Sequence, residues 1–517
     1  MNGKNILLAS CLLTLSSAAV AKPSLGRPNV IFIYADDMGK GMLSAYGQQF
    51  LQTPNIDKIV KGGLEFSNAY GGHFSSPARA MLLTGYSDCR ADIFTIGKGG
   101  QFKVDTSKIA NVEATIDAQR VRLADNDDYL GEMFQRAGYT TAQVGKLGYA
   151  FCSTRREMTD QGWDYYYGFL DHVRCHGYFP PFLFNSGRID MIEGNTHNDC
   201  AKSGEPYDVP KNEERRLNMD GKVQYSQDLF NSWIRDFLRD HSDEPFFLYH
   251  PSQLPHGPLS VPELHEQVKD VKGLTHGEKE YATMMILLDE AVGMIMEEVE
   301  RLGIADNTMF IFSSDNGHEI YTQTSNSSTS KQTIQPSRVK VDNSSVKYRS
   351  VLCGDIFDGN MGMAGLKRSN LEGGVCVPLA YYMPSKIEAG VSTDVVANYD
   401  FIATMADMLG VAINKNKDAV SYCDVLLNHK KRHLPADRTV VVDSYEGPMI
   451  VRNDGWKVRY NPVTQGFDLY SILIDKQERY EMNSKYPDIL AQLRSELIER
   501  VERTMVRGEY PYLKENN

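Results

Sequence analysis

Near its start the chain reads Asn29-Val30-Ile31-Phe32-Ile33-Tyr34, an apolar and β-branched run that leads directly into Asp36 and Asp37. A run of this kind is typical of a strand buried on both faces of a sheet. The same arrangement recurs at residues 308–312, followed by Asp315-Asn316-Gly317, and at residues 245–250, followed by Pro255-His256-Gly257-Pro258. The sequence therefore predicts three buried strands, each leading into polar side chains.

Helical patterns separate these strands, for example the apolar spacing at residues 281–302. Strands that alternate with helices indicate an α/β fold, here a large mixed, mostly parallel sheet sandwiched by helices. Parallel strands end at one edge of a sheet, where ligands bind in such folds. We therefore expect the polar residues that follow the three strands to lie together: Asp36, Asp37, His256, Asp315 and Asn316.

The pattern changes after a predicted helix at residues 400–409. Short strands at residues 439–442, 449–452 and 456–460, followed by a helix at residues 489–506, indicate a smaller antiparallel sheet packed by one helix. Residues 322–344 are rich in Ser, Thr, Gln and Asn, which predicts an exposed insertion. The expected division is a leader at 1–21, a main domain carrying the candidate site at 22–410, and a C-terminal α+β subdomain at 411–517.

The first 21 residues have the features of a secretory signal. Lys4 precedes an apolar run at residues 6–15, and Ala19-Val20-Ala21 offers a cleavage site, so we expect export with cleavage after Ala21. A bacterial lipoprotein signal ending at Cys11 is the second interpretation. No later apolar run approaches the roughly 20 residues of a membrane helix, so we expect no transmembrane segment.

The charge of the chain limits its partners. The 517 residues carry 55 Lys and Arg against 67 Asp and Glu, a formal net charge of -12, and this becomes -13 when Lys4 leaves with the leader. Nucleic-acid binding needs clustered Lys and Arg, so we expect no nucleic-acid partner. An anionic ligand would have to bind in a local cationic pocket.

A short motif at Ser75-Ser76-Pro77-Ala78-Arg79 suggests such a pocket. The hydroxyl of Ser75 is expected just before a helix start, with Pro77 in the first turn, where its missing N–H has no cost. The free amides of a helix N-terminus attract anions, and Arg79 adds a forked cationic donor. An ordinary capped helix is the alternative interpretation.

The acidic strand ends indicate a metal site. Asp36 and Asp37 with Asp315 and Asn316 supply the hard oxygen ligands that Ca²⁺ or Mg²⁺ prefers. Zinc would need several His or Cys ligands, and the cysteines show no C-x-x-C spacing. Acidic residues that cap helices or face solvent are the alternative.

The segment from Ser75 to Gly85 resembles the type I sulfatase signature C/S-x-P-x-R-x-x-x-x-T-G. Further motifs of that family stand in the same order, namely Asp36-Asp37, Gly145-Lys146, residues 255–258, Asp315-Asn316-Gly317, and Gly365-Leu366-Lys367 with residues 372–374. The chain thus resembles formylglycine-dependent, serine-type sulfatases of the alkaline phosphatase superfamily, and among them carbohydrate sulfatases of gut-type Bacteroides.

This resemblance implies specific roles. Ser75 would be oxidised to formylglycine (3-oxoalanine), the nucleophile, by an anaerobic radical maturing enzyme, which with the leader places the protein in the periplasm. One Ca²⁺ ion would be held by Asp36, Asp37, Ser75, Asp315 and Asn316. The sulfate ester would be surrounded by Arg79, Lys146, His256 and Lys367. Asp315 would help to deprotonate the nucleophile, and His256 or Lys367 would protonate the leaving alcohol.

One position departs from the family pattern. Many relatives read G-K-x-H, whereas this chain has Gly148 where the histidine is expected. That histidine is linked to the formylglycine hydroxyl, so we hypothesise that His73, two residues before Ser75, replaces it. A loop histidine without a catalytic role is the alternative.

The segment Cys175-His176-Gly177-Tyr178-Phe179-Pro180-Pro181-Phe182 resembles one in sulfatases that act on galactose-configured sugars. We therefore expect His176 to contact the sugar, with Arg349 as a second candidate contact. The predicted substrate is a 3-O-sulfated galactose or N-acetylgalactosamine at the end of a mucin-type glycan or glycosaminoglycan. Two alternatives stay open: a phosphodiesterase or phosphonate monoester hydrolase on the same fold, and a non-catalytic protein that binds sulfated glycans.

Overall fold

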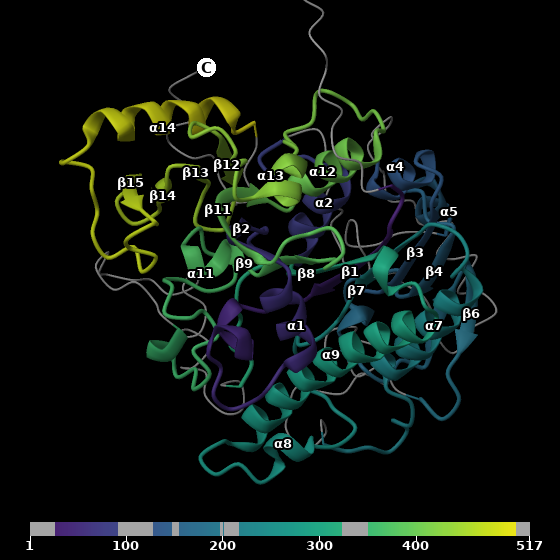
Figure 1. Cartoon of the computed structure of the whole chain (residues 1–517). Coiled ribbons are helices and arrows are strands. Elements are labelled where there is room, and N and C mark those ends of the chain that lie inside the picture. The colour runs from purple at the N-terminus through teal and green to yellow at the C-terminus, as the bar shows by residue number, and fades with distance from the viewer. Residues whose placement is uncertain are drawn as a thin grey trace, which may run out of the picture.

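A computed structural model describes residues 26–90, 128–146, 155–196, 200, 217–322 and 350–502. Within these residues, one large sheet of eleven strands crosses the molecule and a four-stranded sheet lies toward the C-terminus (Figure 1). The predicted α/β class with a second, smaller antiparallel sheet is confirmed.

The large sheet has the strand order β11-β2-β10-β8-β1-β7-β3-β4-β5-β6, with β9 paired to β2. Its strands are β1 (Asn29–Ala35), β2 (Leu64–Tyr70), β3 (Thr140–Gly145), β4 (Tyr165–Gly168), β5 (Phe182–Asn185), β6 (Arg188–Met191), β7 (Phe246–Pro251), β8 (Thr308–Ser314), β9 (Cys376–Val377), β10 (Leu379–Tyr382) and β11 (Gly390–Ala397). Only β5, β9 and β10 run against the other strands of this sheet. The three strands predicted from their apolar runs are the neighbours β7, β1 and β8, all parallel.

Alternating side chains of β1 pack into two separate hydrophobic cores, one on each face of the sheet, as expected for a strand buried on both faces. Phe32 packs in the core that includes helices α2, α4, α12 and α13. Ile33 packs in the core that includes α1, α7 and α9 on the opposite face (Figure 1). The helices are α1 (Pro54–Gly62), α2 (Ser75–Thr84), α4 (Leu130–Arg136), α5 (Arg155–Asp160), α7 (Ser226–Asp240), α8 (Glu266–Lys269), α9 (His276–Arg301), α11 (Glu372–Val375), α12 (Asp400–Leu409) and α13 (Cys423–Asn428).

The small sheet is antiparallel in the order β12-β13-β14-β15. Its strands are β12 (Thr439–Val442), β13 (Met449–Arg452), β14 (Trp456–Asn461) and β15 (Gly466–Ser471), and α14 (Pro487–Arg500) packs on them. Leu493 and Leu497 of α14 bury their side chains against Val441 and Ile450. Short 3-10 turns stand at Lys40–Met42, Ser44–Tyr46, Arg174–His176, Ala305–Asn307 and Ser350–Cys353.

Two helix boundaries, the start of α9 and the end of α14, lie several residues from their predicted positions. Helix α9 begins at His276, because Thr275 accepts a hydrogen bond from the Glu278 amide and Glu278 reaches back to the Thr275 amide, which forms a capping box. Helix α14 ends at Arg500, where Val501 adopts an extended conformation. None of the helices in the described ranges is long and apolar enough to cross a membrane.

Candidate active site

The polar residues after β1, β7 and β8 meet at one edge of the large sheet, as predicted. The parallel register of these strands brings Asp36 and Asp37 beside Asp315 and His256. The Asp37 amide donates to Asp315 Oδ1 at 3.0 Å, and the Asp36 amide donates to the Leu254 carbonyl at 3.0 Å. Backbone contacts between neighbouring strand ends thus fix where the carboxylates stand.

Ser75 begins α2 instead of preceding it. Phe74 is the N-cap, in an extended conformation, and no side chain caps this helix. The Ser75 hydroxyl donates to Asp36 Oδ1 at 2.8 Å. The helix start therefore directs this hydroxyl at the acidic strand end.

Arg79 stands one helical turn after Ser75 on the same face. Its Nη2 donates to Asp315 Oδ2 at 3.1 Å and lies 3.7 Å from Asp36 Oδ1. The side chain is fully buried, and its Nε and Nη1 have no hydrogen-bond partner within the described structure. A buried guanidinium with unused donors one turn from a hydroxyl is suited to holding an anion there.

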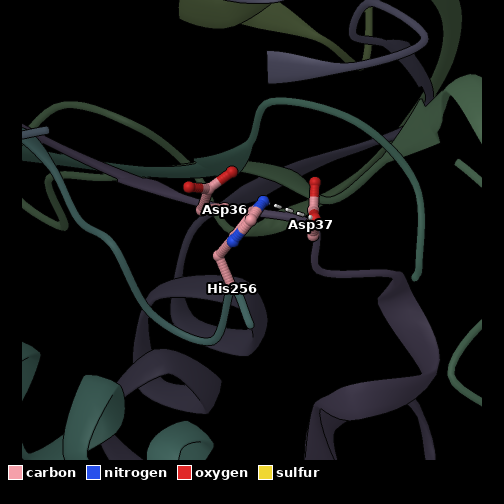
Figure 2. A group of neighbouring side chains, drawn as sticks. All are labelled: Asp36, Asp37 and His256. Carbon is pink, nitrogen blue, oxygen red and sulfur yellow. Dashed lines mark ion pairs between the residues drawn. The ribbon is translucent and has the colours of Figure 1, made fainter. Parts of the chain in front are cut away.

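Asp36, Asp37 and His256 form a compact group whose ligand atoms all lie within 4.8 Å of one another (Figure 2). His256 Nε2 lies 3.3 Å from Asp37 Oδ2. Asp37 has a φ of 63°, a left-handed conformation that is uncommon for residues other than glycine. The sharp turn after β1 therefore lets two consecutive aspartates both face the site.

Asn316 completes a set of oxygen donors that fits a cation. Its Nδ2 donates to Asp37 Oδ1 at 2.9 Å, whereas its buried Oδ1 has no hydrogen-bond partner in the part of the chain that the structure describes. A buried acceptor without a donor is costly unless a ligand satisfies it. Carboxylates of Asp36, Asp37 and Asp315 with this amide oxygen match the ligand chemistry of Ca²⁺.

Two lysines from distant parts of the chain neutralise the paired aspartates. Lys146, at the end of β3, donates to Asp36, and Lys367 Nζ donates to Asp37 Oδ2 at 2.5 Å. Lys367 Nζ also lies 3.4 Å from His256 Nε2. All these side chains are buried, so the charges act on one another with little solvent screening.

The surrounding charges set the pKa values of the three aspartates. Burial acts to raise the pKa of Asp36, but Lys146, His256 and Arg79 outweigh it and hold this pKa below its ordinary range. The same balance with Lys367 lowers the pKa of Asp37 to about 2. Burial, with the repulsion of Asp36, raises the pKa of Asp315 to about 7 despite Arg79. Asp315 is therefore the aspartate of the set whose charged form is least favoured by its protein surroundings.

Of His73, His176 and Arg349, which the sequence suggested as further site residues, His73 and His176 lie in the described residues. The His176 ring centroid lies 4.3 Å from that of His256, so His176 joins the site. His73 is fully buried with Nδ1 3.4 Å from Asp88 Oδ2, and no contact between its ring and Ser75 is observed within the described residues. Arg349 and Gly148 lie outside the described residues, so the replacement of the missing histidine stays a hypothesis.

Tyr321 is a site residue that the sequence did not indicate. Its hydroxyl donates to Asp37 Oδ2, and its ring centroid lies 5.2 Å from that of His256. A Cβ added at Gly257 would stand 2.3 Å from the Tyr321 ring, so glycine is required there for this approach. No spacing rule connects a tyrosine six residues after Asp315 with the aspartate at the end of β1.

Comparisons with known proteins agree with this geometry. The family model described as Sulfatase matches residues 28–411. An N-acetylgalactosamine-6-O-sulfatase from Bacteroides thetaiotaomicron is 26% identical over 530 residues, covering 92% of this chain and 93% of its own length. A human N-acetylgalactosamine-6-sulfatase is 29% identical over 294 residues, covering 56% of this chain and 50% of its own.

Solved structures show the same fold. A sulfatase from work on glycosaminoglycan metabolism by Bacteroides thetaiotaomicron superposes with a TM-score of 0.68 at 22% identity, covering 92% of this chain and all of its own. A second structure, solved with a neocarrahexaose, gives a TM-score of 0.65 at 21% identity, covering 95% and 96%. With the family model spanning most of the chain and the motif residues gathered at one sheet edge, this protein belongs to the sulfatase family of sulfuric ester hydrolases.

Proposed function

We propose that this sulfatase is a carbohydrate sulfatase that removes a sulfate ester from a sugar of a glycan. The observation that carries the proposal is the pair of unused buried groups beside Ser75: the Arg79 donors and the Asn316 Oδ1 acceptor. The first suits a sulfate oxygen and the second suits a metal ion. Ser75 itself donates to Asp36 Oδ1 at 2.8 Å, and Arg79 Nη2 lies 3.7 Å from the same oxygen.

The residues present fit the groups that the family implies. Asp36, Asp37, Asp315 and Asn316 would hold Ca²⁺ together with the modified Ser75. When bound and formed, Ca²⁺ and the hydrated formylglycine would supply Lewis acidity and a hydroxyl nucleophile for attack on sulfur. Oxidation of Ser75 would depend on the radical maturing enzyme proposed from the serine in the motif.

The remaining chemistry belongs to side chains of the chain. Arg79, Lys146 and Lys367 would bind the sulfate oxygens and stabilise charge as the sulfuryl group transfers. Asp315, whose Oδ1 accepts from the Asp37 amide and whose Oδ2 accepts from Arg79, would help to accept the proton of the nucleophile. His256, 3.4 Å from Lys367 Nζ, shares with that lysine the position from which a proton reaches the departing sugar oxygen.

The finer substrate assignment rests on His176. Its place beside His256 allows it to contact the sugar that carries the sulfate, and we propose 3-O-sulfated galactose or N-acetylgalactosamine. The relatives reported above are named for the 6-sulfate of N-acetylgalactosamine. Both assignments involve galactose-configured sugars and differ in which hydroxyl faces the nucleophile.

A panel of sulfated sugars tests the proposal. We expect the mature enzyme to hydrolyse 3-O-sulfated galactose or N-acetylgalactosamine faster than the 4-O and 6-O isomers, and His176→Ala to lose most of that preference. Turnover only of the 6-sulfated N-acetylgalactosamine would overturn the proposed 3-O position of the sulfate. Turnover only of phosphate or phosphonate esters would overturn the sulfatase assignment. Ser75→Ala is the control, with no turnover expected.

We also propose export to the periplasm, which rests on the leader at residues 1–21. N-terminal sequencing of the protein from its host should find a start at Lys22. Recovery of a lipid-modified Cys11 would instead establish the lipoprotein.

A further inference from the structure

We propose that the exposed ring of Tyr445, backed by the parallel ring of Phe74, forms a platform on which a sugar ring of the glycan stacks while its sulfate occupies the site at Ser75. This inference rests on the proposed carbohydrate substrate and deepens it. We refer to the two side chains together as the aromatic platform.

The two rings are nearly parallel. Their centroids lie 5.5 Å apart with an interplanar angle of 9°. Phe74 immediately precedes Ser75 at the start of α2, so the platform begins one residue from the nucleophile. Tyr445 is 42% exposed, so part of its ring stays accessible to a ligand while the other part packs on Phe74.

The platform is tied to the anion pocket through the backbone. The Tyr445 amide donates to the Arg368 carbonyl at 3.2 Å, and the Arg368 amide donates to the His73 carbonyl at 2.7 Å. Arg368 follows Lys367, which contacts Asp37. The loop that carries Tyr445 is therefore joined both to the segment before the nucleophile and to a lysine of the sulfate pocket.

His73 supports the platform from within the protein. Its buried ring packs edge-on against both aromatic rings, with centroids 4.7 Å from Phe74 and 5.4 Å from Tyr445. Asp88 Oδ2 lies 3.4 Å from Nδ1 of the same imidazole. This packing gives His73 a positioning role that does not require contact with the substrate.

The chemistry of the platform favours a sugar. An aromatic face offers a broad apolar surface, and the Tyr445 hydroxyl adds a polar edge, the combination that suits a pyranose with C–H groups on one face and hydroxyls at its rim. Tyr445 lies three residues after the end of β12, a strand of the small sheet. The C-terminal unit would thus supply a substrate contact to a site otherwise built by the large sheet.

Binding measurements on the full chain test this inference. Expression without a maturing enzyme leaves Ser75 unconverted, so calorimetry can measure affinity without turnover. The probes are trisaccharides ending in 3-O-sulfated galactose or 6-O-sulfated N-acetylgalactosamine, and inorganic sulfate. We expect Tyr445→Ala to weaken trisaccharide binding about tenfold, the loss of one aromatic stack, with sulfate affinity unchanged. Tyr445→Phe and Tyr445→Trp keep an aromatic face and should stay within about threefold of the wild type.

Tyr480→Ala is the matched control, because Tyr480 is 66% exposed in the same C-terminal unit. It should bind all probes as the wild type does. The platform would be overturned if Tyr445→Ala bound the trisaccharides as tightly as the wild type, or if Tyr445→Trp lost as much affinity as Tyr445→Ala. It would also be overturned if Tyr445→Ala lost sulfate affinity in parallel, or if the wild type bound no trisaccharide. Failure of the converted wild type to hydrolyse any sulfated sugar would instead overturn the proposed function, whatever the platform binds.

Discussion

Asp37 receives charged and polar donors on both carboxylate oxygens in a space closed to solvent. Asn316 donates to Oδ1, while Lys367 and Tyr321 donate to Oδ2. Burial alone would raise the pKa of Asp37, and Lys367 lowers it to about 2. Each donor also fixes the orientation of a carboxylate expected to ligate the metal, which is the usual task of groups around metal ligands.

Tyr321→Phe isolates one of these donors. It removes the hydroxyl that reaches Asp37 and keeps the ring beside His256. Because hydrogen bonds to charged groups contribute about 1.5–3 kcal/mol, we expect kcat/KM to fall roughly tenfold or more and the calcium requirement to rise. Tyr480→Phe, at an exposed site, is the control. Unchanged turnover and calcium dependence would show that Tyr321 does not position Asp37.

The ends of strands, the starts of helices and the loops between them determine where the site residues lie. The strand ends could be predicted because buried strands have an unmistakable apolar pattern and parallel strands share an edge. Thr275 and Glu278, three residues apart, form the capping-box pattern that marks the start of α9. The predicted boundary instead follows the apolar spacing, which begins only at Tyr281. The contact of Tyr321 with Asp37 could not be predicted, because it depends on how a loop folds back over Gly257.

Thr275→Ala should destabilise the protein through α9. Loss of an N-cap side chain costs about 1 kcal/mol, and this one also closes a capping box over a helix that covers one face of the sheet. Chemical denaturation measures the change in free energy of unfolding. Thr275→Ser keeps the oxygen and should restore most of it; equal loss in both variants would contradict the capping role.

The lowered pKa of Asp355 makes the free energy of unfolding depend on pH. Burial acts to raise its pKa, but His318 and the Gly359 amide lower it to about 2 from an ordinary 3.8. A depressed folded-state pKa means that its contribution, about 2 kcal/mol, is present above pH 4 and is lost as the pH falls toward 2. The stability difference between wild type and Asp355→Asn should shrink over that window. A difference that is constant between pH 6 and pH 2 would refute this assignment.

In the whole molecule, a buried ionic network joins the small sheet to the large one. Lys457 of β14 lies 3.0 Å from Glu372 Oε1 and 3.2 Å from Glu478 Oε1, with all three side chains fully buried. Tyr70 of β2 donates to the same Glu372. The two sheets could be predicted from separate strand patterns, whereas their docking could not, because these partners are far apart in the sequence.

Lys457→Met should loosen this junction. It leaves two carboxylates buried without their cation, which typically costs about 3–5 kcal/mol. Lys430→Met is the control, because its partner Glu388 and Lys430 itself are both more than half exposed, and such pairs contribute less than about 1 kcal/mol. Equal effects of the two substitutions on the free energy of unfolding would contradict a structural role of the network.

The proposed sulfatase chemistry depends above all on Ser75 as the origin of the nucleophile. Mass spectrometry of the peptide that contains Ser75, purified from the native host, tests this most directly when paired with turnover of a sulfated sugar. We predict a residue two hydrogens lighter than serine, with turnover that rises in proportion to the converted fraction. Full turnover by protein that carries only unmodified serine would contradict this role of Ser75.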